Sequence, residues 1–504
     1  MFLSYWVLDD PAVAFTTLDS FGIAMSVPRI AVIAAAGKGL RLHPRSIHTA
    51  KVMIDAGGKK LLTRHIERLR DELRIAKIYI ILGYLGDQIR NAYGDGSSLG
   101  VDIRYVENPD VDYGLGTALR ILEHRITEPF VLVLGDELYL KSNQNALVNI
   151  SVPYVAICAI YPTADHGLIR KNYSVTMENE RIISLTEKPE EVQSEFAGCG
   201  TYVFTPEIFK DVHETLPSLR TGRLELTDII NHAAHRGAPV LPFVLSGEYV
   251  NVNTAEDLNT ANFLCRTEAF DEQQISVIVP ADNEAASIGY VVKDFLALVD
   301  EVIVMDNESD DGTALVARQA GATVHSRQLC GYGDALKKGM DAANGDILVL
   351  VEADATFRAK DLGKLLEYLK DADMVIGTRT TRQLIEQGAN MIGILRFGNL
   401  VFGKLIEVLW WKFEPRFTDV GCTYRVIWRD AYLKIRDYLV CDDATFSPEM
   451  MIEVVRGHGR LIEVPVSYYR RRGGTSKHSG NLWQSILTGL RMLRIIVMKR
   501  LNLI

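Results

Sequence analysis

A group of residues near the start of the chain has the types needed to hold a phosphate chain. A glycine-rich turn at residues 36–41 (AGKGLR) follows the apolar run 30–35, and Lys51 comes ten residues after Arg41. Glycine lets the backbone turn tightly and point its N–H groups at an anion, while arginine and lysine neutralise the charge. The spacing fits neither the P-loop nor the dinucleotide-binding pattern G-x-G-x-x-G. The turn therefore predicts a site for a phosphorylated ligand.

Carboxylates close apolar runs in the second half of the chain. Asp306 follows the run 301–305, and Glu352 and Asp354 follow the run 346–351. Because Glu352 and Asp354 are two positions apart, they share one face of an extended chain and can clamp a divalent ion against a diphosphate. Such a triplet is common by itself, so its neighbours must decide its meaning.

The same order of elements positions these residues in both halves. Short β-rich runs alternate with amphipathic helical segments such as residues 61–74 and 256–264. We predict an α/β protein with two Rossmann-like doubly wound domains in tandem, in which ligands bind at the carboxyl ends of the strands. The predicted strands are residues 30–35, 77–82 and 130–134 in the first half and 275–279, 301–305 and 346–351 in the second.

The predicted domain boundaries follow from this order. They are a leader at residues 1–25, a first domain at 26–262, a polar linker at 263–274, a second domain at 275–480 and a basic amphipathic helix at 481–504. The leader has no basic start and is broken by Asp9, Asp10 and Pro11, which argues against a signal peptide and makes Met25 a candidate start.

Composition is typical of a soluble globular protein. The 504 residues predict two or three domains at ~150 residues each, and 48% hydrophobic with 24% charged residues is an ordinary balance. The six cysteines are scattered without a zinc-binding spacing, and no apolar run reaches the ~20 residues that cross a bilayer. We therefore expect a protein of the reducing cytoplasm.

The charge of the chain is unevenly distributed. The net charge is −9, yet residues 464–504 hold eight basic and no acidic residues, so this tail carries +8 and the remainder −17. Within the tail, residues 481–504 place apolar side chains at helical spacing among basic ones, a pattern typical of a helix in an anionic membrane surface. The apolar segment 392–411 favours the same surface. A core or dimer role for both helices, and a solvated basic face, remain the alternatives.

The first half resembles the sugar-1-phosphate nucleotidylyltransferases over residues 28–262. Their signature G-x-G-x-R-L, followed by Pro-Lys, matches residues 37–42 and Lys51, with Ala50 in place of the proline. Further matches follow in the family's order at residues 114–118 (GLGTA), 135–136 (GD), 187–189 (EKP), 198–204 and 252–254 (VNT). The resemblance implies a nucleotide and sugar site that includes Ala36, Gly37, Gly39, Gly116, Thr117, Glu187 and Gly200.

The resemblance also implies a reaction. An oxygen of a sugar-1-phosphate attacks the α-phosphorus of a nucleoside triphosphate in line, and pyrophosphate leaves. The nucleophile is already anionic, so the protein has to align two polyanions and neutralise their charge. Asp136 and Asn253 would bind Mg²⁺ or Mn²⁺, with one negative charge fewer than in the many relatives that carry Asp at the second position. Arg41 and Lys51 would stabilise pyrophosphate, and Lys188 would hold the sugar phosphate.

The second half resembles the family 2 glycosyltransferases of GT-A fold over residues 275–480, especially the polyprenol-phosphate sugar synthases. Residues 418–425 (TDVGCTYR) are similar to that group's Asp-x-x-x-Gly-Phe-Arg, and residues 471–477 (RRGGTSK) to its Arg-x-x-Gly-x-Ser-Lys. Ala281-Asp282 departs from the usual aromatic-containing approach to Asn-Glu, and Glu352 replaces the first Asp of the metal motif. The resemblance implies nucleotide-sugar contacts from Pro280, Asn283, Glu284, Asp306 and Asp311, metal ligation by Glu352 and Asp354, and catalytic roles for Asp354 and Asp419.

The implied second reaction transfers a sugar from its nucleoside diphosphate to an acceptor, with inversion at the anomeric carbon. A lipid phosphate, with a second pKa of ~6, attacks without a base. Arg425, Arg471, Ser476 and Lys477 are the groups that would bind it. A hydroxyl acceptor requires a general base, for which Asp419, Asp442 and Asp443 are the candidates.

We therefore predict a bifunctional enzyme that forms a nucleotide sugar and then transfers the sugar, with a polyprenyl phosphate as the acceptor. Two alternatives stay open: a soluble or saccharide acceptor, and a first domain that only binds nucleotide and regulates the transferase. The predicted partners are a nucleoside triphosphate, a sugar-1-phosphate, the NDP-sugar, a lipid phosphate and a membrane surface, but no nucleic acid. The base, the sugar and a homo-oligomeric state are left open, as is peripheral attachment at the inner face of the cell membrane.

Overall fold

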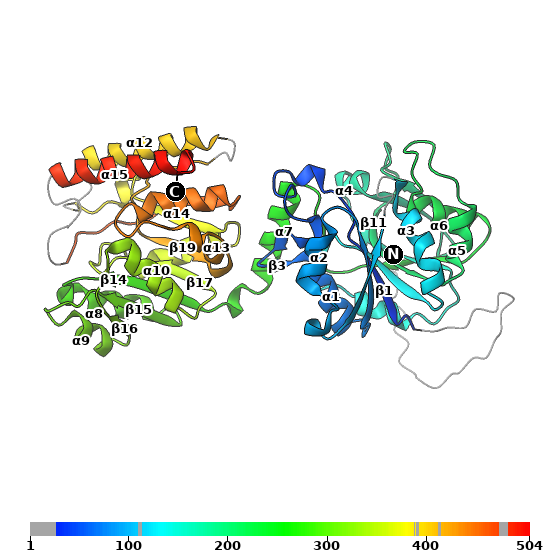
Figure 1. Cartoon of the computed structure of the whole chain (residues 1–504), viewed down its shortest axis with the longest axis horizontal. Helices are drawn as coiled ribbons and strands as arrows, with labels where there is room; N and C mark the ends of the chain where they lie inside the picture. Colours follow the sequence, from blue (N-terminus) through cyan, green and yellow to red (C-terminus); the bar gives the residue numbers. More distant parts are fainter. Residues whose placement is uncertain are drawn as a thin grey trace. The chain divides into compact units, whose positions relative to one another are not determined.

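The computed structural model describes residues 27–108, 113–387, 389, 393–411, 415–472 and 482–503. The chain divides after Leu258 into two compact units, and each is described by itself (Figure 1). The leader predicted for residues 1–25 lies outside the described residues.

A nine-stranded mixed sheet is the frame of the first unit. Its strands are β1 (Ile30–Ala34), β4 (Lys77–Leu82), β5 (Asp102–Glu107), β6 (Phe130–Leu134), β8 (Ala156–Pro162), β9 (Tyr173–Glu178), β10 (Arg181–Glu187), β11 (Phe196–Phe204) and β12 (Val240–Val244). They are ordered β10-β9-β11-β6-β1-β4-β5, and β8 pairs with both β11 and β12. Strands β6, β1, β4 and β5 are parallel, so their carboxyl ends meet at one edge.

Helices cover both faces of this sheet (Figure 1). They are α1 (Leu61–Asp71), α2 (Gly86–Tyr93), α3 (Leu115–Leu122), α4 (His166–Lys171), α5 (Ile208–Glu214) and α6 (Leu226–His235). Successive residues of a strand point to opposite faces, so Ile30 and Val32 of β1 join the core that includes α3, α5 and α6. Ala31 and Ile33 join the core that includes α1 and α2. Burial on both faces explains why these strands are apolar throughout.

Smaller elements complete the first unit. Two short ladders pair β7 (Glu137–Leu140) with β13 (Glu248–Asn251) and β2 (Asp55–Ala56) with β3 (Lys59–Lys60). Single 3-10 turns lie at Leu40–Leu42 and Lys51–Met53, in the loop that follows β1. The β7 and β13 pair is important for the site because it lies directly beside the end of β6.

A helix occupies much of the segment predicted as a polar linker. α7 (Ala255–Glu268) continues past the predicted helix end at Leu264, and a 3-10 turn follows at Phe270–Glu272. Arg266 is buried and donates to the Ala372 carbonyl oxygen at 2.8 Å and to the Asp373 carboxylate at 2.6 Å. These partners lie far along the chain, so the polar composition of residues 263–274 gave no sign of them.

A seven-stranded sheet is the frame of the second unit. Its strands are β14 (Ile275–Ala281), β15 (Glu301–Asp306), β16 (Thr323–Ser326), β17 (Ile347–Leu350), β18 (Met374–Thr378), β19 (Arg425–Trp428) and β20 (Leu461–Pro465). They are ordered β16-β15-β14-β17-β19-β18-β20, with β19 antiparallel to both of its neighbours. Two α/β units, each with a largely parallel centre, confirm the predicted fold class.

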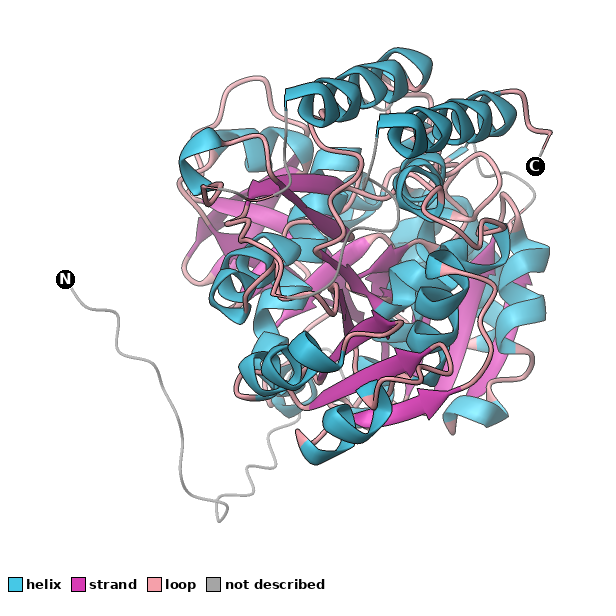
Figure 2. Cartoon of the chain, turned by 90° about the vertical axis from the view of Figure 1, so that its left-hand side faces the viewer, coloured by secondary structure: helices cyan, strands magenta, loops and turns pink. Residues whose placement is uncertain are grey.

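Helices pack on this sheet as well. They are α8 (Ala285–Leu296), α9 (Thr313–Gln319), α10 (Tyr332–Ala342), α11 (Leu362–Leu369), α12 (Gly393–Leu409), α13 (Arg429–Ile435), α14 (Phe446–Arg456) and α15 (Leu482–Arg500). α12 and α15 lie side by side on one side of the unit (Figures 1 and 2). Among the described residues, no helix combines the length and apolar composition needed to span a bilayer.

Helix α15 is held by a buried charge cluster. The Lys499 ammonium is 1% exposed and lies 2.9 Å from the Glu449 carboxylate and 3.0 Å from the Glu453 carboxylate, both on α14. It also donates to the Tyr438 carbonyl oxygen at 2.6 Å. Burying a charge is costly unless opposite charges and hydrogen bonds surround it, and these partners meet that condition. Lys499 therefore fixes one end of α15 to the sheet domain.

Replacing this lysine with a side chain of similar length tests its role. We expect Lys499→Met to destabilise the second unit by about 3–5 kcal/mol, because the buried Glu449 carboxylate loses its cation. The exposed pair Lys434–Asp430 offers a matched control, since its side chains are 52% and 30% exposed. Lys434→Met should change the free energy of unfolding by less than about 1 kcal/mol. Urea unfolding followed by fluorescence measures both, and equal stability of the two variants would contradict the assignment.

Candidate functional site

Four predicted residues of the first unit meet at one point. Lys51 Nζ contacts the Asp136 carboxylate and lies 2.9 Å from Asn253 Oδ1. Arg41 Nη2 donates to the same amide oxygen at 2.8 Å. Asp136 follows β6 and Asn253 follows β13, while Arg41 and Lys51 come from the loop after β1. The structure thus brings two cations and two oxygen ligands together at the carboxyl edge of the sheet.

Local backbone geometry delivers the two cations. Gly39 has φ +62°, a left-handed conformation that opens the turn bearing Arg41, and an added Cβ there would lie 3.2 Å from the Lys51 side chain. Ala50, which stands where the family has proline, donates its N–H to Gln88 Oε1 at 3.0 Å. A proline has no N–H to give. A hydrogen bond to α2 therefore holds the Lys51 loop in place.

The charges in this site depend on one another. Burial by itself would raise the pKa of Asp136, but the Lys51 ammonium beside it holds that pKa below its ordinary value. Glu137, the next residue, is 2% exposed, and burial raises its pKa to about 7. Its carboxylate accepts from the hydroxyls of Tyr139 and Tyr249 and from the Gly200 N–H. The site therefore contains one ionised carboxylate that faces cations and one that faces only neutral donors.

The donor set fits a divalent cation of the hard class. The Asp136 carboxylate and the Asn253 amide oxygen already converge on one positive centre, the Lys51 ammonium. Mg²⁺ is bound in proteins by one or two such oxygens together with substrate phosphates. No cluster of three or more His, Cys, Asp or Glu side chains suited to a metal occurs in the part of the chain that the structure describes. Any cation here would therefore share its shell with the substrates.

The predicted sugar side of the site lies along β10 and β11. Glu187 ends β10, and burial raises its pKa despite the neighbouring Lys188 ammonium, whose Nζ is 3.6 Å from the carboxylate. Lys188 is exposed, and its φ of +46° places it at a sharp turn. Gly200 is committed to Glu137 through its N–H, at 2.7 Å. These groups border the Asp136 site through Glu137.

Residues 114–118, which include the predicted site residues Gly116 and Thr117, open α3. Thr117 Oγ1 donates to the Gly114 carbonyl oxygen at 2.7 Å, and Gly116 N–H donates to the Leu224 carbonyl oxygen at 3.1 Å. Gly116 has no room for a Cβ against the Leu224 side chain. Its small size therefore serves packing as well as any ligand. In the loop after β1, Gly37 has open space around it and Ala36 accepts the Tyr84 N–H.

The second site is built around Glu352 and Asp354, which follow β17. Asp354 is 5% exposed; its Oδ1 accepts from the Thr356 N–H and hydroxyl, and its Oδ2 lies 3.4 Å from Arg471. Burial and the Asp354 carboxylate raise the pKa of Glu352 to about 8. Arg471 also pairs with Glu284, at the start of α8. Two carboxylates on one extended face are thus present, with Arg471 as their cation.

The remaining predicted nucleotide contacts divide into two kinds. Asp306 ends β15, is 1% exposed, and its Oδ1 has no hydrogen-bond partner. Asn283 has φ +58° and exchanges hydrogen bonds with residues 309–310, and Pro280 lies inside β14. Asp311 accepts from Thr313 and from the Ala285 N–H; these bonds outweigh burial and lower its pKa. Asp306 is thus open to a ligand, whereas Asp311 shapes the loop.

Two predicted residues of the second domain have other work. Arg425 is 1% exposed, and its guanidinium donates to the carbonyl oxygens of Cys422, Ser447 and Val420 at 2.6–3.0 Å. It has no donor left for an acceptor phosphate, which corrects that prediction. Asp419 is fully buried and pairs with the Arg379 guanidinium through both oxygens, at 2.8 and 2.9 Å. That geometry also excludes Asp419 as a catalytic base, because no acceptor can reach it.

Three further predictions complete the account of this site. Ser476 and Lys477 lie outside the described residues. Asp442 pairs with Lys337 at 2.7 Å, and Asp443 accepts from the Thr445 N–H and hydroxyl at the start of α14. Both are therefore engaged in the fold as it stands.

Sequence reasoning missed several polar residues that the site uses. Arg379 gave no signal, since its partner Asp419 lies 40 positions further on. Asn172, Asn251 and Glu137 were missed as well. Asn251 had a local signal, because it is two positions before Asn253 and so shares its face of the extended chain.

Two protein families match this chain. The nucleotidyl transferase family matches residues 30–294, and the glycosyl transferase family 2 matches residues 276–425. A UTP–glucose-1-phosphate uridylyltransferase of Haloferax volcanii is 32% identical over 233 residues, which cover 46% of this chain and 94% of that protein. A glucose-1-phosphate thymidylyltransferase of Streptomyces antibioticus is 29% identical over 268 residues, covering 52% and 72%.

The second half has relatives of its own class. An uncharacterized glycosyltransferase of Mycobacterium bovis is 33% identical over 228 residues, which cover 44% of this chain and 97% of that protein. Both transferase domains expected from the sequence are thus present, in the expected order. Because the first family match spans more than half of the 504 residues, the chain belongs to the nucleotidyl transferase family, and it carries a family 2 glycosyl transferase domain after that region.

Proposed function

We propose that the first domain joins a nucleoside triphosphate to a sugar-1-phosphate and releases pyrophosphate. The observation that carries this proposal is the meeting of Arg41, Lys51, Asp136 and Asn253 at one sheet edge. Two named relatives act, by their names, on glucose-1-phosphate with UTP or form a thymidylyl product. Glucose-1-phosphate with UTP or dTTP is therefore the first substrate pair to test.

The chain's own residues account for the chemistry of this step. Arg41 and Lys51 neutralise the β- and γ-phosphates as pyrophosphate departs, and Lys188 holds the sugar phosphate in line with the α-phosphorus. Asp136 and Asn253 would hold Mg²⁺, which supplies further neutralisation of the phosphate oxygens. No base is required, because the attacking phosphate oxygen is already ionised. The absence of a general base from this chemistry agrees with Glu137, whose carboxylate is occupied by three donors.

We propose that the second domain transfers the sugar from the nucleoside diphosphate to a polyprenyl phosphate. The unpartnered Asp306 oxygen is suited to a base or ribose donor, and Glu352 with Asp354 would hold Mg²⁺ or Mn²⁺ against the diphosphate. The lipid phosphate oxygen attacks the anomeric carbon from the opposite side, and the nucleoside diphosphate leaves. An acceptor that is already anionic agrees with Asp419 being locked by Arg379, since that carboxylate cannot remove a proton.

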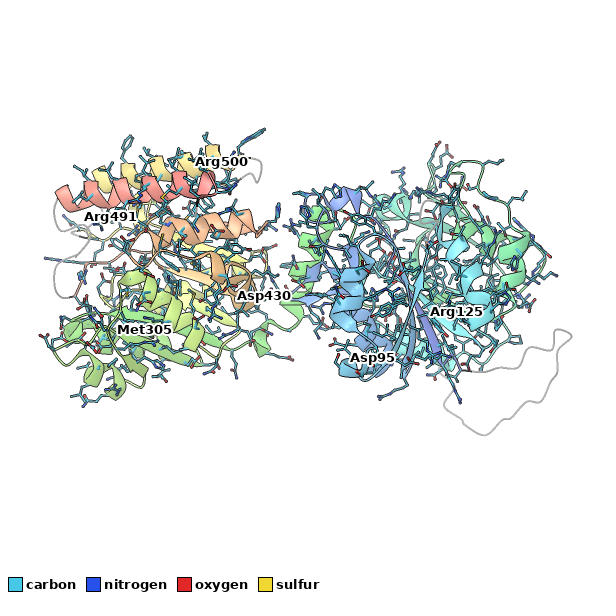
Figure 3. All side chains as sticks on the ribbon, viewed as in Figure 1. Asp95, Arg125, Met305, Asp430, Arg491 and Arg500 are labelled. Atoms are coloured by element: carbon cyan, nitrogen blue, oxygen red, sulfur yellow. The ribbon has the colours of Figure 1, made fainter. Side chains whose placement is uncertain are left out.

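The lipid acceptor is supported by an apolar surface on α12 and α15. Exposed apolar side chains gather on both helices: Phe397, Leu400, Val401 and Val408 on α12, and Ile486, Leu487, Leu490, Leu493 and Val497 on α15. Arg491, Arg494 and Arg500 are exposed on α15, and Figure 3 labels the first and last of them. An apolar face with arginines among it is suited to the surface of an anionic membrane. We infer peripheral attachment there.

Single carboxylate changes should separate the two reactions. Asp136→Asn should lower pyrophosphate release by about 10²-fold or more, because the phosphate charge loses a ligand, and should leave transfer from supplied UDP-glucose unchanged. Asp354→Asn should lower transfer from supplied UDP-glucose and leave pyrophosphate release unchanged. Pyrophosphate release and label in an organic-extractable product are the two measurements.

Two carboxylates at the opposite ends of the strands serve as controls. The Asp95 carbonyl oxygen accepts from Ile103 at the start of β5, and Asp430 follows Arg429, whose N–H donates to Asp346 just before β17 (Figure 3). Asp95→Asn and Asp430→Asn should keep both activities. Full pyrophosphate release by Asp136→Asn would show that the metal assignment is wrong, and label in a water-soluble saccharide would replace the lipid acceptor.

Metal binding by the second domain should depend on pH. Glu352 has a pKa of about 8 and must lose its proton to ligate a cation. Titration of Mn²⁺ into the Asp136→Asn chain should therefore show affinity that rises with pH up to about 8, by at most about tenfold per unit, and then levels. Glu352→Gln should bind more weakly and lose the pH dependence. The same slope in Glu352→Gln would assign the proton to another group.

Vesicle binding tests the α12 and α15 surface. The chain should sediment with vesicles that contain phosphatidylglycerol and be released by salt. Arg494→Glu should weaken binding by about fivefold or more, since each cation near an anionic surface contributes about 1 kcal/mol. Arg318→Glu on α9, at the other end of the second unit, is the control (Figure 1). Equal binding of neutral and anionic vesicles by the unmodified chain would refute the electrostatic part of the proposal.

A further inference from the structure

Five polar side chains of the first domain form a continuous hydrogen-bonded chain, which we call the amide relay. The Asn253 amide donates to Asn251 Oδ1 at 2.5 Å, and the Asn251 amide donates to Asn172 Oδ1 at 2.6 Å. The Asn172 amide donates to the Tyr249 hydroxyl at 3.3 Å, and that hydroxyl donates to Glu137 Oε1 at 2.7 Å.

Results

Sequence analysis

A group of residues near the start of the chain has the types needed to hold a phosphate chain. A glycine-rich turn at residues 36–41 (AGKGLR) follows the apolar run 30–35, and Lys51 comes ten residues after Arg41. Glycine lets the backbone turn tightly and point its N–H groups at an anion, while arginine and lysine neutralise the charge. The spacing fits neither the P-loop nor the dinucleotide-binding pattern G-x-G-x-x-G. The turn therefore predicts a site for a phosphorylated ligand.

Carboxylates close apolar runs in the second half of the chain. Asp306 follows the run 301–305, and Glu352 and Asp354 follow the run 346–351. Because Glu352 and Asp354 are two positions apart, they share one face of an extended chain and can clamp a divalent ion against a diphosphate. Such a triplet is common by itself, so its neighbours must decide its meaning.

The same order of elements positions these residues in both halves. Short β-rich runs alternate with amphipathic helical segments such as residues 61–74 and 256–264. We predict an α/β protein with two Rossmann-like doubly wound domains in tandem, in which ligands bind at the carboxyl ends of the strands. The predicted strands are residues 30–35, 77–82 and 130–134 in the first half and 275–279, 301–305 and 346–351 in the second.

The predicted domain boundaries follow from this order. They are a leader at residues 1–25, a first domain at 26–262, a polar linker at 263–274, a second domain at 275–480 and a basic amphipathic helix at 481–504. The leader has no basic start and is broken by Asp9, Asp10 and Pro11, which argues against a signal peptide and makes Met25 a candidate start.

Composition is typical of a soluble globular protein. The 504 residues predict two or three domains at ~150 residues each, and 48% hydrophobic with 24% charged residues is an ordinary balance. The six cysteines are scattered without a zinc-binding spacing, and no apolar run reaches the ~20 residues that cross a bilayer. We therefore expect a protein of the reducing cytoplasm.

The charge of the chain is unevenly distributed. The net charge is −9, yet residues 464–504 hold eight basic and no acidic residues, so this tail carries +8 and the remainder −17. Within the tail, residues 481–504 place apolar side chains at helical spacing among basic ones, a pattern typical of a helix in an anionic membrane surface. The apolar segment 392–411 favours the same surface. A core or dimer role for both helices, and a solvated basic face, remain the alternatives.

The first half resembles the sugar-1-phosphate nucleotidylyltransferases over residues 28–262. Their signature G-x-G-x-R-L, followed by Pro-Lys, matches residues 37–42 and Lys51, with Ala50 in place of the proline. Further matches follow in the family's order at residues 114–118 (GLGTA), 135–136 (GD), 187–189 (EKP), 198–204 and 252–254 (VNT). The resemblance implies a nucleotide and sugar site that includes Ala36, Gly37, Gly39, Gly116, Thr117, Glu187 and Gly200.

The resemblance also implies a reaction. An oxygen of a sugar-1-phosphate attacks the α-phosphorus of a nucleoside triphosphate in line, and pyrophosphate leaves. The nucleophile is already anionic, so the protein has to align two polyanions and neutralise their charge. Asp136 and Asn253 would bind Mg²⁺ or Mn²⁺, with one negative charge fewer than in the many relatives that carry Asp at the second position. Arg41 and Lys51 would stabilise pyrophosphate, and Lys188 would hold the sugar phosphate.

The second half resembles the family 2 glycosyltransferases of GT-A fold over residues 275–480, especially the polyprenol-phosphate sugar synthases. Residues 418–425 (TDVGCTYR) are similar to that group's Asp-x-x-x-Gly-Phe-Arg, and residues 471–477 (RRGGTSK) to its Arg-x-x-Gly-x-Ser-Lys. Ala281-Asp282 departs from the usual aromatic-containing approach to Asn-Glu, and Glu352 replaces the first Asp of the metal motif. The resemblance implies nucleotide-sugar contacts from Pro280, Asn283, Glu284, Asp306 and Asp311, metal ligation by Glu352 and Asp354, and catalytic roles for Asp354 and Asp419.

The implied second reaction transfers a sugar from its nucleoside diphosphate to an acceptor, with inversion at the anomeric carbon. A lipid phosphate, with a second pKa of ~6, attacks without a base. Arg425, Arg471, Ser476 and Lys477 are the groups that would bind it. A hydroxyl acceptor requires a general base, for which Asp419, Asp442 and Asp443 are the candidates.

We therefore predict a bifunctional enzyme that forms a nucleotide sugar and then transfers the sugar, with a polyprenyl phosphate as the acceptor. Two alternatives stay open: a soluble or saccharide acceptor, and a first domain that only binds nucleotide and regulates the transferase. The predicted partners are a nucleoside triphosphate, a sugar-1-phosphate, the NDP-sugar, a lipid phosphate and a membrane surface, but no nucleic acid. The base, the sugar and a homo-oligomeric state are left open, as is peripheral attachment at the inner face of the cell membrane.

Overall fold

The computed structural model describes residues 27–108, 113–387, 389, 393–411, 415–472 and 482–503. The chain divides after Leu258 into two compact units, and each is described by itself (Figure 1). The leader predicted for residues 1–25 lies outside the described residues.

A nine-stranded mixed sheet is the frame of the first unit. Its strands are β1 (Ile30–Ala34), β4 (Lys77–Leu82), β5 (Asp102–Glu107), β6 (Phe130–Leu134), β8 (Ala156–Pro162), β9 (Tyr173–Glu178), β10 (Arg181–Glu187), β11 (Phe196–Phe204) and β12 (Val240–Val244). They are ordered β10-β9-β11-β6-β1-β4-β5, and β8 pairs with both β11 and β12. Strands β6, β1, β4 and β5 are parallel, so their carboxyl ends meet at one edge.

Helices cover both faces of this sheet (Figure 1). They are α1 (Leu61–Asp71), α2 (Gly86–Tyr93), α3 (Leu115–Leu122), α4 (His166–Lys171), α5 (Ile208–Glu214) and α6 (Leu226–His235). Successive residues of a strand point to opposite faces, so Ile30 and Val32 of β1 join the core that includes α3, α5 and α6. Ala31 and Ile33 join the core that includes α1 and α2. Burial on both faces explains why these strands are apolar throughout.

Smaller elements complete the first unit. Two short ladders pair β7 (Glu137–Leu140) with β13 (Glu248–Asn251) and β2 (Asp55–Ala56) with β3 (Lys59–Lys60). Single 3-10 turns lie at Leu40–Leu42 and Lys51–Met53, in the loop that follows β1. The pair of β7 and β13 matters for the site because β7 begins just after β6 ends.

A helix occupies much of the segment predicted as a polar linker. α7 (Ala255–Glu268) continues past the predicted helix end at Leu264, and a 3-10 turn follows at Phe270–Glu272. Arg266 is buried and donates to the Ala372 carbonyl oxygen at 2.8 Å and to the Asp373 carboxylate at 2.6 Å. These partners lie far along the chain, so the polar composition of residues 263–274 carried no sign of them.

A seven-stranded sheet is the frame of the second unit. Its strands are β14 (Ile275–Ala281), β15 (Glu301–Asp306), β16 (Thr323–Ser326), β17 (Ile347–Leu350), β18 (Met374–Thr378), β19 (Arg425–Trp428) and β20 (Leu461–Pro465). They are ordered β16-β15-β14-β17-β19-β18-β20, with β19 antiparallel to both of its neighbours. Two α/β units, each with parallel strands at its centre, confirm the predicted fold class.

Helices pack on this sheet as well. They are α8 (Ala285–Leu296), α9 (Thr313–Gln319), α10 (Tyr332–Ala342), α11 (Leu362–Leu369), α12 (Gly393–Leu409), α13 (Arg429–Ile435), α14 (Phe446–Arg456) and α15 (Leu482–Arg500), the last within the predicted basic helix. α12 and α15 lie side by side on one side of the unit (Figures 1 and 2). Among the described residues, no helix combines the length and apolar composition needed to span a bilayer.

Helix α15 is held by a buried charge cluster. The Lys499 ammonium is 1% exposed and lies 2.9 Å from the Glu449 carboxylate and 3.0 Å from the Glu453 carboxylate, both on α14. It also donates to the Tyr438 carbonyl oxygen at 2.6 Å. Burying a charge is costly unless opposite charges and hydrogen bonds surround it, and these partners meet that condition. Lys499 therefore fixes one end of α15 to the rest of the unit.

Replacing this lysine with an uncharged side chain of similar length tests its role. We expect Lys499→Met to destabilise the second unit by about 3–5 kcal/mol, because the buried Glu449 carboxylate loses its cation. The pair Lys434–Asp430 offers a matched control, since its side chains are 52% and 30% exposed. Lys434→Met should change the free energy of unfolding by less than about 1 kcal/mol. Urea unfolding followed by fluorescence measures both, and equal stability of the two variants would contradict the assignment.

Candidate functional site

Four predicted residues of the first unit meet at one point. Lys51 Nζ contacts the Asp136 carboxylate and lies 2.9 Å from Asn253 Oδ1. Arg41 Nη2 donates to the same amide oxygen at 2.8 Å. Asp136 follows β6 and Asn253 follows β13, while Arg41 and Lys51 come from the loop after β1. The structure thus brings two cations and two oxygen ligands together at the carboxyl edge of the sheet.

Local backbone geometry delivers the two cations. Gly39 has φ +62°, a left-handed conformation that opens the turn bearing Arg41, and an added Cβ there would lie 3.2 Å from the Lys51 side chain. Ala50, which stands where the family has proline, donates its N–H to Gln88 Oε1 at 3.0 Å. A proline has no N–H to give. A hydrogen bond to α2 therefore holds the Lys51 loop in place.

The charges in this site depend on one another. Burial by itself would raise the pKa of Asp136, but the Lys51 ammonium beside it holds that pKa below its ordinary value. Glu137, the next residue, is buried, and burial raises its pKa to about 7. Its carboxylate accepts from the hydroxyls of Tyr139 and Tyr249 and from the Gly200 N–H. One carboxylate of the site therefore faces cations, and its neighbour faces neutral donors.

The donor set fits a divalent cation that prefers oxygen ligands. The Asp136 carboxylate and the Asn253 amide oxygen already converge on one positive centre, the Lys51 ammonium. Mg²⁺ is bound in proteins by one or two such oxygens together with substrate phosphates. No cluster of three or more His, Cys, Asp or Glu side chains suited to a metal occurs in the part of the chain that the structure describes. A cation here would therefore be coordinated partly by the protein and partly by oxygens of the substrates.

The predicted sugar side of the site lies along β10 and β11. Glu187 ends β10, and burial raises its pKa despite the neighbouring Lys188 ammonium, whose Nζ is 3.6 Å from the carboxylate. Lys188 is exposed, and its φ of +46° places it at a sharp turn. Gly200 donates its N–H to Glu137 at 2.7 Å. Through Glu137, the strand that carries Gly200 borders the Asp136 site.

Residues 114–118, which include the predicted site residues Gly116 and Thr117, open α3. Thr117 Oγ1 donates to the Gly114 carbonyl oxygen at 2.7 Å, and the Gly116 N–H donates to the Leu224 carbonyl oxygen at 3.1 Å. A Cβ on Gly116 would collide with the Leu224 side chain, so its small size serves packing. Ala36 and Gly37 lie in the loop after β1, where the Ala36 carbonyl oxygen accepts the Tyr84 N–H.

The second site is built around Glu352 and Asp354, which follow β17. Asp354 is 5% exposed. Its Oδ1 accepts from the Thr356 N–H and hydroxyl, and its Oδ2 lies 3.4 Å from Arg471. Burial and the Asp354 carboxylate raise the pKa of Glu352 to about 8. Arg471 also pairs with Glu284, which precedes α8, so one guanidinium faces two of the predicted carboxylates.

The other predicted nucleotide contacts are of two kinds. Asp306 ends β15 and is 1% exposed, and within the described residues its Oδ1 has no hydrogen-bond partner. Asn283 has φ +58° and exchanges hydrogen bonds with residues 309–310, and Pro280 lies inside β14. Burial would raise the pKa of Asp311, but hydrogen bonds from Thr313 and from the Ala285 N–H lower it. Asp306 Oδ1 is thus left unpaired by the described residues, whereas Asp311 shapes the loop.

Two predicted residues of the second domain have structural roles instead. Arg425 is 1% exposed, and its three guanidinium nitrogens donate to the carbonyl oxygens of Cys422, Ser447 and Val420. Because the guanidinium donates to three backbone carbonyl oxygens, the prediction that Arg425 binds an acceptor phosphate is corrected. Asp419 is fully buried and pairs with the Arg379 guanidinium through both oxygens, at 2.8 and 2.9 Å. This pairing and burial argue against Asp419 as a catalytic base.

The remaining predictions for this site have different outcomes. Ser476 and Lys477 lie outside the described residues. Asp442 pairs with Lys337 at 2.7 Å. Asp443 accepts from the Thr445 N–H and hydroxyl at the start of α14. Both aspartates are therefore engaged in holding the fold.

Sequence reasoning missed several polar residues around the two sites. Arg379 gave no signal, since its partner Asp419 lies 40 positions further on. Asn172 and Glu137 were missed as well. Asn251 had a local signal, because it is two positions before Asn253 and shares its face of the extended chain.

Two protein families match this chain. The nucleotidyl transferase family matches residues 30–294, and the glycosyl transferase family 2 matches residues 276–425. A UTP–glucose-1-phosphate uridylyltransferase of Haloferax volcanii is 32% identical over 233 residues, which cover 46% of this chain and 94% of that protein. A glucose-1-phosphate thymidylyltransferase of Streptomyces antibioticus is 29% identical over 268 residues, which cover 52% of this chain and 72% of that protein.

The chain also has relatives among the glycosyltransferases. An uncharacterized glycosyltransferase of Mycobacterium bovis is 33% identical over 228 residues, which cover 44% of this chain and 97% of that protein. Both transferase domains expected from the sequence are thus present, in the expected order. Because the first family match spans more than half of the 504 residues, the chain belongs to the nucleotidyl transferase family and carries a family 2 glycosyl transferase domain as its second transferase.

Proposed function

We propose that the first domain joins a nucleoside triphosphate to a sugar-1-phosphate and releases pyrophosphate. The observation that carries this proposal is the meeting of Arg41, Lys51, Asp136 and Asn253 at one sheet edge. Two relatives are named for glucose-1-phosphate, one as a uridylyltransferase and one as a thymidylyltransferase. Glucose-1-phosphate with UTP or dTTP is therefore the first substrate pair to test.

The chain's own residues account for this chemistry. Arg41 and Lys51 neutralise the β- and γ-phosphates as pyrophosphate departs, and Lys188 holds the sugar phosphate in line with the α-phosphorus. Asp136 and Asn253 would hold Mg²⁺, which supplies further neutralisation of the phosphate oxygens. The attacking phosphate oxygen is already ionised, so the step requires no general base.

We propose that the second domain transfers the sugar from its nucleoside diphosphate to a polyprenyl phosphate. The Asp306 oxygen is suited to a donor on the base or ribose, and Glu352 with Asp354 would hold Mg²⁺ or Mn²⁺ against the diphosphate. A lipid phosphate oxygen attacks the anomeric carbon from the opposite side, and the nucleoside diphosphate leaves. An acceptor that is already anionic agrees with the pairing of Asp419 to Arg379, which leaves that carboxylate unsuited to removing a proton.

A lipid acceptor is supported by an apolar surface on α12 and α15. Exposed apolar side chains gather there: Phe397, Leu400, Val401 and Val408 on α12, and Ile486, Leu487, Leu490, Leu493 and Val497 on α15. Arg491, Arg494 and Arg500 are exposed on α15, and Figure 3 labels the first and last of them. An apolar face interspersed with arginines is suited to an anionic membrane surface. Peripheral attachment of this surface would bring the second domain to its lipid.

Single carboxylate changes should separate the two reactions. Asp136→Asn should lower pyrophosphate release by about 10²-fold or more, because the cation that neutralises the phosphates loses a charged ligand. It should leave transfer from supplied UDP-glucose unchanged. Asp354→Asn should lower transfer from supplied UDP-glucose and leave pyrophosphate release unchanged. Pyrophosphate release and label in an organic-extractable product are the two measurements.

Two aspartates at the opposite ends of the strands serve as controls for this experiment. The Asp95 carbonyl oxygen accepts from Ile103 at the start of β5, and Asp430 follows Arg429, whose N–H donates to Asp346 just before β17 (Figure 3). Asp95→Asn and Asp430→Asn should keep both activities. Full pyrophosphate release by Asp136→Asn would show that the metal assignment is wrong. Label in a water-soluble saccharide would rule out the lipid acceptor.

Metal binding by the second domain should depend on pH. Glu352 has a pKa of about 8 and must lose its proton to ligate a cation. The affinity of the Asp136→Asn chain for Mn²⁺ should therefore rise as the pH increases toward that pKa, by at most about tenfold per unit, and then level off. Glu352→Gln should bind Mn²⁺ more weakly and lose this pH dependence. Calorimetric titration measures both, and the same slope in Glu352→Gln would assign the proton to another group.

Vesicle binding tests the surface formed by α12 and α15. The chain should sediment with vesicles that contain phosphatidylglycerol and be released by salt. Arg494→Glu should weaken this binding by about fivefold or more, since each cation near an anionic surface contributes about 1 kcal/mol. Arg318→Glu on α9, at the other end of the second unit, is the control (Figure 1). Equal binding of neutral and anionic vesicles by the unmodified chain would refute the electrostatic part of the proposal.

A further inference from the structure

Five polar side chains of the first domain form a continuous hydrogen-bonded chain, which we call the amide relay. The Asn253 amide donates to Asn251 Oδ1 at 2.5 Å, and the Asn251 amide donates to Asn172 Oδ1 at 2.6 Å. The Asn172 amide donates to the Tyr249 hydroxyl at 3.3 Å, and that hydroxyl donates to Glu137 Oε1 at 2.7 Å. The relay thus runs from the predicted metal ligand to a buried carboxylate.

Both ends of the relay fix its direction. Glu137 accepts two hydrogen bonds on its other oxygen, from the Tyr139 hydroxyl and the Gly200 N–H, and Tyr249 donates to Oε1. At the opposite end, Lys51 and Arg41 carry donors and no acceptor, so the Asn253 oxygen must face them. Each amide between these ends can then satisfy its neighbours in one orientation.

The relay also explains the residue type at position 253. An aspartate there has no hydrogen to donate to Asn251 Oδ1, so two acceptor oxygens would face each other. The amide supplies the donor on one side and an oxygen for a cation on the other. Many relatives carry aspartate at this position, with one more negative charge. In this chain the amide has Asn251 as its acceptor.

The relay touches the loops for both substrates. The main-chain carbonyl oxygen of Asn172 accepts the backbone N–H of Lys188 at 2.8 Å. The side-chain amide of the same residue takes part in the relay. Lys188 is the residue predicted to hold the sugar phosphate, and Asn253 faces the cations predicted to hold the triphosphate. Tyr249 and Asn172 are 7% and 6% exposed, so this link runs through the interior.

We propose that Asn251, Asn172 and Tyr249 are positioning residues, which aim the Asn253 oxygen at the shared cation and align it with the sugar-phosphate loop. The inference rests on the proposed nucleotidyl transfer. Groups that orient a ligand from behind commonly affect the rate more than binding, because a misaimed oxygen still attracts the substrate but stabilises the transition state less. The relay therefore predicts a loss in kcat rather than in KM.

Two relay variants and one matched control test this proposal in the full chain. Asn251→Leu fills a similar volume but breaks the relay next to Asn253, and Tyr249→Phe removes only the distal hydroxyl. Tyr154→Phe is the control, because Tyr154 is 6% exposed in the same domain and lies outside the relay. Pyrophosphate release is measured for every chain at the same pH. Calorimetric titration with Mn²⁺ alone gives a second readout.

The expected results separate positioning from general damage. Asn251→Leu should lower kcat by about 10–100-fold with little change in KM, and should weaken Mn²⁺ binding. Tyr249→Phe should lower kcat less, and the double variant should be no worse than Asn251→Leu, because both break one chain. Additive losses, a loss confined to KM, or an equal loss in Tyr154→Phe would overturn the relay. An unmodified chain that releases no pyrophosphate would end the proposed function, and equal Mn²⁺ affinity with and without Asn251 would still refute the relay by itself.

Discussion

The contact between Lys51 and Asp136 is the interaction on which the site of the first unit depends. A carboxylate taken partly out of water is unfavourable unless cations or several donors face it. Strand β6 ends just before Asp136, and the loop after the adjacent parallel strand β1 brings Lys51 to it. The pair therefore forms only when the sheet is assembled with its parallel strands in register. Asn253, which follows β13, adds a second oxygen to the same cation.

The same constraint separates structural from functional charges in the second unit. Arg379 with Asp419, and Lys499 with Glu449, are compensated pairs that hold the fold. Around β15 and β17 the protein does not pair all of its polar groups in this way. Among the described residues an oxygen of Asp306 lacks a partner, and Glu352 has a raised pKa. A buried oxygen without a partner and a carboxyl group with a perturbed pKa are both characteristic of ligand sites, and both stand at strand ends.

Helices α12 and α15 show how one element can serve both structure and surface. The inner side of α15 places Ile496 and Lys499 in the interior, while Leu490 and Arg494 stay exposed. A helix that needed only to cover the core would gain little from leucines on its outer side, because exposed apolar area is unfavourable in water. The buried lysine fixes the helix and leaves its apolar face available.

The sequence by itself determined the two-sheet α/β architecture, the order of the two transferase domains and the types of residue at the strand ends. Those features are local: apolar runs such as residues 77–82 and 130–134 and glycine turns need only their neighbours in the chain to be recognised. Tertiary structure decided which charged side chains are paired inside the protein and so are not available to a ligand. Arg425 and Asp419 match a motif, yet folding buries them against backbone carbonyls and Arg379, whereas Asn251 and Asn172 gain their place in the relay. These outcomes depend on contacts between residues far apart in the chain, and burial then sets whether each charge pairs or binds.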